Sequence, residues 1–323
     1  MSGGNLTENI NKKGNQMTTS VILSCYNGSK YIIEQLESLR RQTRTPDEVI
    51  IADDCSSDET VRKIREYTDR YKLDKWKIYV NKHNKGWRCN FIHSFALASS
   101  DIIFPCDQDD IWNPEKIEMM ASVMEKHPEI GVLVSNFKVL NYVPETKIPG
   151  VYTMKYDNSL EKIEFTSRFM NIRRPGCVYG FKSEFMGLIK QIWTENQSHD
   201  ALLWRLGMIT DSLYLYCFES IKWRRFEGCA TFNTLDNWEE RKKEYAGWIE
   251  QCTFFEKWLS KRDIEGKVYK IKTVRKCRKA AELIFRIKEK NKIQDYMMLT
   301  LYGNLFANPK SVYKEIYQLL RHK

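Results

Sequence analysis

Residues 20–54 read SVILSCYNGSKYIIEQLESLRRQTRTPDEVIIADD, a stretch with an apolar segment at each end and a helical pattern between them. The first apolar segment, residues 20–25, is rich in β-forming residues and is followed by a Tyr-Asn-Gly turn signal. Apolar residues then recur at helical spacing over residues 31–39. The second segment, residues 49–52, ends in two aspartates. A strand, a helix and a second strand in this order predict two parallel strands of one sheet.

The same alternation continues along the chain. Further strands are expected at residues 76–80, 102–104 and 130–137, with a helix over residues 87–98 and another after Pro114. We therefore predict an α/β fold, a Rossmann-like and mostly parallel sheet flanked by helices. In such sheets ligands bind beyond the carboxyl ends of the strands.

The remaining segments are weaker or differ in type. Ser56 and Glu59 have capping-box spacing and predict the start of a helix. Later in the chain we expect strands at 177–181, 213–218 and 221–226, a helix at 201–209, and helices at 238–260, 266–290, 292–306 and 310–321. The predicted domains are a mobile tail (1–17), a sheet domain (18–236, with a first half 18–137 and a second half 138–236) and a basic helical extension (237–323).

Composition limits the class of protein. Hydrophobic residues make up 42% and charged residues 29%, a mix typical of globular proteins. No apolar run is long enough to span a membrane, and residues 1–17 lack the apolar core of a secretory signal. The nine cysteines form no Cys-x-x-Cys pair, which favours buried, reduced thiols over a disulfide framework or zinc site. These features indicate a cytoplasmic location.

The net charge of +10 is concentrated near the end of the chain. Residues 241–323 hold 21 Lys and Arg against 9 Asp and Glu. Solvated helical faces, a dimer contact or an anionic surface would each account for this excess. Aromatic and basic residues alternate there, as in helices that lie on the inner face of a membrane. No nucleic-acid-binding motif is present, so no nucleic-acid partner is expected.

An acidic cluster, residues 107–110, follows the strand at 102–104. In an extended segment Asp107 and Asp109 point to one side and Asp110 to the other. Two carboxylates at that spacing suit Mg²⁺ or Mn²⁺, which prefer oxygen ligands. The alternative is a helix cap, but Asn113 already occupies that position.

Four ordered segments resemble the family 2 glycosyltransferases, which have the GT-A fold. They are residues 21–27 (VILSCYN), 49–60 (VIIADDCSSDET), 84–86 (NKG) with Asn90-Phe91, and 106–112 (CDQDDIW). The last string is especially similar to the rhamnosyltransferase branch. The similarity continues more weakly through Cys177 and the His199-Asp200 pair, and nothing diagnostic follows residue 236.

The resemblance implies a role for each matching residue. Nucleotide-sugar binding falls on Ser24, Tyr26, Asp53, Asp54, Arg88, Asp107 and Arg224. Asp107 and Asp109 match the metal-binding Asp-x-Asp motif, and Asp200 matches the catalytic base that deprotonates the acceptor hydroxyl. The family's usual histidine after the basic pair is replaced by Phe226.

The resemblance also implies an activity. It predicts a metal-dependent, inverting transfer of L-rhamnose from dTDP-L-rhamnose to a glycan or lipid-linked acceptor in cell-surface polysaccharide synthesis. A UDP-hexose transferase of the same fold is the first alternative. A nucleotide-sugar-binding protein without activity is the second, prompted by Phe226. A dehydrogenase is disfavoured because no Gly-x-Gly occurs in the chain.

Overall fold

The computed structural model describes residues 16–140, 154–195, 197–225, 238–290, 292–306 and 311–321. Within these ranges one sheet has the strand order β3-β2-β1-β4-β8-β6-β9-β5, with β7 also paired to β9. The first half of the sheet is parallel and consists of β1 (Thr19–Cys25), β2 (Glu48–Asp53), β3 (Trp76–Val80) and β4 (Ile102–Asp107). Its apolar runs are buried on both faces in β1, β2 and β4, as expected for central parallel strands.

The second half of the sheet is mixed. It comprises β5 (Ile111–Trp112), β6 (Val132–Leu140), β7 (Leu160–Lys162), β8 (Tyr179–Lys182) and β9 (Leu213–Arg224). Strand β8 runs antiparallel between β4 and β6, whereas β6 and β9 form a long parallel pair. Most paired residues are therefore in parallel ladders, and the predicted α/β fold is confirmed.

Two strand predictions need correction. The strands expected at 213–218 and 221–226 are one strand, β9, whose register against β6 shifts on either side of Asn136. The irregularity lets one long strand bend without ending. The strand expected at 177–181 begins as a 3₁₀ turn, Gly176–Val178, before β8.

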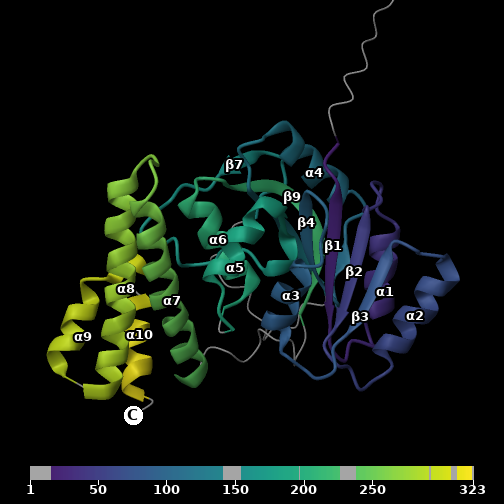
Figure 1. Cartoon of the computed structure of the whole chain (residues 1–323). Coiled ribbons are helices and arrows are strands. Elements are labelled where there is room, and N and C mark those ends of the chain that lie inside the picture. The colour runs from purple at the N-terminus through teal and green to yellow at the C-terminus, as the bar shows by residue number, and fades with distance from the viewer. Residues whose placement is uncertain are drawn as a thin grey trace, which may run out of the picture.

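Helices cover the sheet (Figure 1). They are α1 (Ile32–Arg40), α2 (Thr60–Tyr71), α3 (Trp87–Phe95), α4 (Lys116–Lys126), α5 (Met186–Ile192) and α6 (His199–Ile209). The predicted capping box is wrong: α2 begins at Thr60 without a side-chain cap, and the Ser56 hydroxyl donates to Asp53 instead. A capping serine would accept a hydrogen bond from a helix amide, but the Ser56 oxygen accepts from the Asn27 amide at 2.8 Å instead.

The expected helical extension is present. It consists of α7 (Trp238–Ser260), α8 (Lys267–Lys290), α9 (Ile293–Thr300) and α10 (Ser311–Arg321), gathered at the end of the molecule opposite α1 and α2 (Figure 1). The helix expected over 292–306 ends at Thr300, and a 3₁₀ turn follows.

The extension packs against α6 through buried polar contacts. Arg205 Nη1 donates to Gln251 Oε1 at 2.7 Å, and Lys270 Nζ donates to the Ile209 carbonyl at 2.9 Å. Among the described helices, none is both long and apolar enough to cross a membrane. The eight cysteines in the described ranges are free thiols, and all but Cys55 are buried.

Candidate active site at the carboxyl ends of the strands

The parallel register brings the ends of β1, β2 and β4 to one edge. Ser24 lies opposite Ala52 on one side and Asp107 on the other. The Ser24 hydroxyl is buried and accepts a hydrogen bond from Asn90 Nδ2 at 2.8 Å. Asn90 Nδ2 also donates to the Ala52 carbonyl at 2.8 Å. Asn90 thus fixes α3 to the sheet at the edge where Ser24 was predicted to bind nucleotide.

The two aspartates that end β2 shape the neighbouring loops. Asp53 accepts hydrogen bonds from the Ser56 amide at 2.8 Å and from its hydroxyl. Asp54 accepts from the amides of Lys85 at 2.9 Å and Gly86 at 2.8 Å. Both carboxylates are buried at the predicted edge, and both orient backbone there. Their nucleotide contacts stay a prediction.

Tyr26 is held through its backbone. The side-chain amide of Gln108 accepts from the Tyr26 amide at 2.8 Å and donates to the Tyr26 carbonyl at 3.0 Å. This leaves the Tyr26 ring 47% exposed at the site edge, available to a base or ribose. Gln108 was not among the predicted site residues, although it lies within the string that resembles the family.

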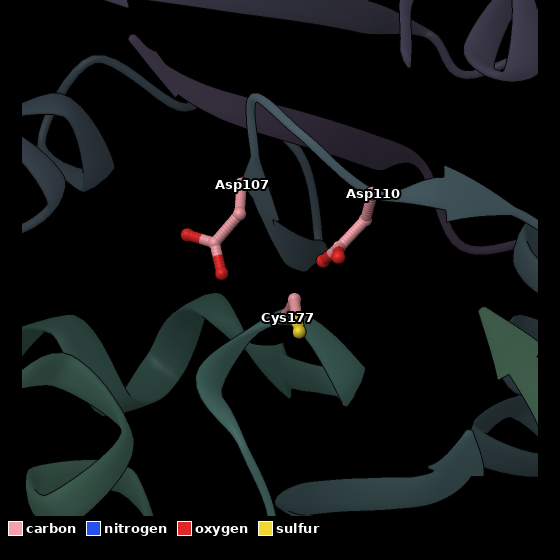
Figure 2. Close-up of side chains that lie close together, drawn as sticks. All are labelled: Asp107, Asp110 and Cys177. Atoms are coloured by element: carbon pink, nitrogen blue, oxygen red, sulfur yellow. The ribbon is translucent and has the colours of Figure 1, made fainter. Parts of the chain in front are cut away.

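The acidic cluster is arranged differently from the prediction. Strand β4 ends at Asp107 and the chain turns through the next two residues, so the alternation of an extended segment does not apply. Asp107, Asp110 and Cys177 lie close together (Figure 2), with one ligand atom from each within 4.8 Å of the others. Asp110, not Asp109, is therefore the partner of Asp107 in this cluster.

Burial raises the pKa values of all three carboxyls. The pKa of Asp107 rises to about 7 through burial and the charges of Asp109 and Asp200. Burial raises the pKa of Asp109 to about 6, although nearby arginines oppose it. Burial and the two neighbouring carboxylates hold the pKa of Asp110 well above its usual range. Such crowding of buried acids is typical of a cation-binding or catalytic site.

A buried lysine lies beneath this cluster. Lys116 Nζ donates to the Cys177 carbonyl at 2.6 Å and lies 3.6 Å from the centre of the Trp112 ring. Burial lowers the pKa of Lys116 to about 8, while the charges of Asp110 and Asp107 favour its protonated form. Lys116 was not among the predicted site residues, because a single lysine at the start of a helix gives no sign of burial.

Arg224 ties β9 to the acidic turn. Its backbone amide donates to Asp110 Oδ1 at 2.9 Å, and its Nε donates to the Asp109 carbonyl at 2.7 Å. Its guanidinium also pairs with Glu34 and lies over the Tyr31 ring. The side chain is buried. It supports the turn, and a phosphate contact stays a prediction.

The donor set fits a divalent cation through its oxygens. Asp110 Oδ2 is buried and finds no nitrogen or oxygen partner within the described residues. Asp107 and Asp110 could supply carboxylate oxygens to Mg²⁺ or Mn²⁺. The Cys177 thiol suits neither ion, because it is a soft ligand and burial raises its pKa.

The predicted base lies across from Asp107. Asp200 is the second residue of α6, and its Oδ1 accepts a hydrogen bond from the Ala201 amide at 2.8 Å. Its charge contributes to the raised pKa of Asp107, so the two carboxylates lie close enough to interact. The structure thus brings Asp107 and Asp110 of the acidic turn near Asp200 of α6.

The residue before the predicted base, His199, packs among aromatic rings. His199 is buried, and its ring lies 4.1 Å from that of Phe91. It also lies against Gly176, where an added Cβ would come within 2.3 Å of His199 Nε2. Burial lowers the pKa of His199. Packing, not charge, therefore positions the start of α6.

Two other predictions concern side chains near this edge. Arg88, the second residue of α3, stacks its guanidinium 4.7 Å from the Trp87 ring centre, and its nucleotide contact stays a prediction. Phe226 lies outside the described residues.

Comparison of solved structures defines the class of fold. The structure of *Staphylococcus aureus* TarS residues 1–349 in complex with UDP-GlcNAc matches with a TM-score of 0.63 at 17% identity, covering 94% of this chain and 89% of that one. The complex of the same fragment with UDP gives a TM-score of 0.62. At this identity the match shows the fold alone, and the predicted GT-A fold is confirmed.

Sequence comparison then gives the family. The model of "Glycosyl transferase family 2" matches residues 20–192, more than half of the chain, and the protein belongs to that family. This confirms the predicted family; the rhamnosyltransferase branch stays a prediction. Asp200 and Arg224 lie beyond the matched residues.

Two named relatives share part of the chain. The *S. aureus* poly(ribitol-phosphate) β-N-acetylglucosaminyltransferase TarS is 32% identical over 214 residues, 62% of this chain and 35% of its own length. The *Escherichia coli* UDP-Glc:α-D-GlcNAc-diphosphoundecaprenol β-1,3-glucosyltransferase WfgD is 32% identical over 122 residues, 38% of this chain and 46% of its own. The chain spans between 35% and 50% of the length of such relatives.

Proposed function

We propose that the protein is an inverting glycosyltransferase that moves a sugar from a nucleoside-diphosphate donor to a hydroxyl of a glycan or lipid-linked acceptor. The observation that carries this proposal is the convergence of Asp107, Asp110 and Asp200 beyond β4 in a chain of family 2. Such a transfer would be one step in the synthesis of a cell-surface polysaccharide.

The chain's own residues define how the transfer would proceed. Asp200 takes the proton from the acceptor hydroxyl as that oxygen attacks the anomeric carbon, a contribution typically worth about 10²–10⁴-fold in rate. The charge of Asp200 contributes to the raised pKa of Asp107, which supports placing the two carboxylates in one site. Tyr26 and the buried Asp54 border the nucleotide side of the site.

A divalent cation, when bound, would neutralise the charge that develops on the departing diphosphate. Asp107 would hold it with Asp110, which lies nearby in the structure, or with Asp109, which the family motif indicates. Lys116 keeps a positive charge beneath these carboxylates and so limits their mutual repulsion before the cation binds.

For the donor we favour a UDP-linked hexose or N-acetylhexosamine. The relative WfgD is named for a UDP-Glc donor, and the TarS fragment has been solved with UDP-GlcNAc. The string at residues 106–112 keeps dTDP-L-rhamnose as a second candidate. Uracil and thymine differ by one methyl group, so Tyr26 and Asp54 could border either base.

A thermal-shift panel tests the donor and the cation together. The protein is heated with UDP, dTDP and GDP sugars, each with and without Mn²⁺. We expect stabilisation by UDP sugars that depends on Mn²⁺, because a ligand that binds only the folded state raises the melting temperature. A shift with dTDP-L-rhamnose alone would favour the second candidate, and no shift with any donor would contradict the proposal.

Two single variants separate the possible cation ligands. Asp110→Ala is expected to abolish the Mn²⁺-dependent part of the shift if the cluster in Figure 2 holds the cation. Asp109→Ala would abolish it if the family motif is the better guide. Release of free nucleotide from donor plus acceptor distinguishes an enzyme from a binding protein that has lost its activity.

A further inference from the structure

Large apolar side chains are exposed on the helical extension. Along α9 and the residue after it, Ile293 is 75% exposed, Met297 68% and Leu301 80%. Every fourth residue of a helix lies on the same face, so these three form a stripe. A second stripe on α10 consists of Tyr313, Tyr317 and Leu320. Exposed apolar stripes on two helices that pack together indicate a surface that binds a partner.

A cationic groove lies on the neighbouring helix. It has a volume of about 550 Å³ and is lined by Val268, Ile271, Lys272, Arg275, Lys276 and Lys279 of α8. Their spacing places all six on one face of the helix. Arg275 pairs with Glu256, whereas Lys272, Lys276 and Lys279 form no ion pair with any described residue.

Charge decides between the possible partners. Two of the acidic side chains near the apolar stripes are neutralised internally, since Asp295 pairs with Arg286 and Glu315 with Arg241. The surface is thus left with unpaired positive charge, and a second copy would meet it with the same sign. A nucleic acid would not need the apolar stripe. An anionic lipid bilayer suits both features, as for helices that lie in the interface plane.

We propose that the extension docks on an anionic lipid surface, with Ile293, Met297 and Leu301 inserted among the head groups and the lysines of the α8 groove attracted to lipid phosphates. In Figure 1 α9 forms the edge of the molecule farthest from α1 and α2, so a flat surface can reach it. The inference deepens the proposed function, because docking would bring the site to a lipid-linked acceptor.

Co-sedimentation of the whole chain with vesicles tests the proposal. We expect binding to phosphatidylcholine vesicles that contain phosphatidylglycerol, little binding to pure phosphatidylcholine, and weakening at high salt. Protein that stays in the supernatant with anionic vesicles at low salt would overturn the proposal.

Two triple variants assign the surface. Ile293→Gln/Met297→Gln/Leu301→Gln is expected to weaken vesicle binding by about tenfold or more, because it removes the inserted apolar groups. Lys272→Gln/Lys276→Gln/Lys279→Gln is expected to weaken it by about a hundredfold at low salt and much less at high salt. All six side chains are exposed to solvent, so we expect both variants to keep the fold.

Two control variants change exposed apolar residues and exposed lysines of the sheet domain. Tyr71→Gln/Tyr79→Gln/Leu97→Gln alters three exposed apolar residues, and Lys75→Gln/Lys126→Gln/Lys190→Gln alters three exposed lysines. Vesicle binding should survive in both. Equal losses in the controls would show nonspecific attraction and overturn the assignment.

Two further measurements separate this proposal from its alternatives. Light scattering of the α9 variant tests for a second copy: a dimer in the wild type that the variant dissociates would overturn the lipid assignment. Donor-induced stabilisation in the absence of vesicles should be the same in both triple variants. Failure of the vesicle test thus leaves the proposed transferase activity standing, and failure of the donor panel leaves lipid docking standing.

Discussion

Charged groups at the carboxyl edge of the sheet are buried and hydrogen-bonded, whereas charged groups on the outer faces of the helical extension are exposed. Around Asp54, Asp110 and Arg224 the charged groups are buried and bonded to backbone, and removal of a partner would leave a charge or polar group without compensation. On the outer faces of α8 and α9, lysines such as Lys272 and apolar side chains such as Met297 face solvent. Substitutions should therefore be costly for activity or stability in the first region and nearly silent for the isolated protein in the second.

The largest effect is expected at Asp200. Asp200→Asn removes the proposed base but keeps the shape of the side chain, so turnover should fall by about 10²–10⁴-fold while donor affinity changes little. Turnover and calorimetric donor binding measure the two separately. Asp69→Asn, an exposed carboxylate on α2, is the control. Equal loss of turnover and donor affinity at Asp200 would indicate a structural role.

The next effect is on stability, at Lys116. Lys116→Met leaves the Cys177 carbonyl without its donor and the nearby carboxylates without their buried cation. Loss of one member of a buried charge cluster typically costs about 3–5 kcal/mol in unfolding free energy, measured here by urea denaturation. Lys126→Met, at the exposed end of the same helix, should change stability by less than about 0.5 kcal/mol. A similar result for both variants would contradict the role of burial.

The sequence predicts the backbone of these two regions better than the placement of their side chains. The strand ends at Cys25, Asp53 and Asp107 follow from apolar runs that stop at polar residues. Parallel register then brings those ends together, and their meeting at one edge of the sheet was predicted correctly for that reason.

Side-chain direction inside the turn was not predictable in the same way. The period-two rule holds only for extended chain, so Asp109 was expected beside Asp107 where the structure places Asp110. The burial of Lys116 depends on β8 and the Gly176–Val178 turn, which are distant in sequence. For the extension, helical spacing predicted the helices, but which faces remain exposed depends on how the helices pack.

Two glycines offer a matched test of local packing near Asp200, the proposed catalytic base. Gly176→Ala would place a Cβ 2.3 Å from His199 Nε2, whereas Gly187→Ala meets nothing within 4 Å. The first should displace His199 and Asp200, lowering turnover by about tenfold and stability by about 1–3 kcal/mol. The second, in the first turn of α5, should be neutral or stabilise by up to about 1 kcal/mol. Both are measured by activity and urea denaturation; full activity in Gly176→Ala would contradict the positioning role of that contact.

The pH dependence of stability should differ with and without cation. Folding raises the pKa of Asp107 from 3.8 to about 7 and that of Asp109 from 3.8 to about 6. Between pH 3.8 and about pH 7 the folded chain therefore binds more protons than the unfolded chain. The free energy of unfolding falls as the pH rises through that range. Mn²⁺ needs deprotonated carboxylates, so it should raise the melting temperature more at pH 8 than at pH 5. Asp107→Asn should flatten both trends, and an unchanged profile in that variant would contradict them.

The smallest effect is expected where the contrast is sharpest, within α9 itself. Met297 is 68% exposed, whereas Leu299, two residues later, is fully buried. Without vesicles, Met297→Gln should change the unfolding free energy by less than about 0.5 kcal/mol, and Leu299→Ala should lower it by about 2–5 kcal/mol. Urea denaturation of both variants measures this difference. A large loss in Met297→Gln that depends on protein concentration would mean that the stripe is already covered by another copy, because a solvent-exposed side chain has no packing to lose.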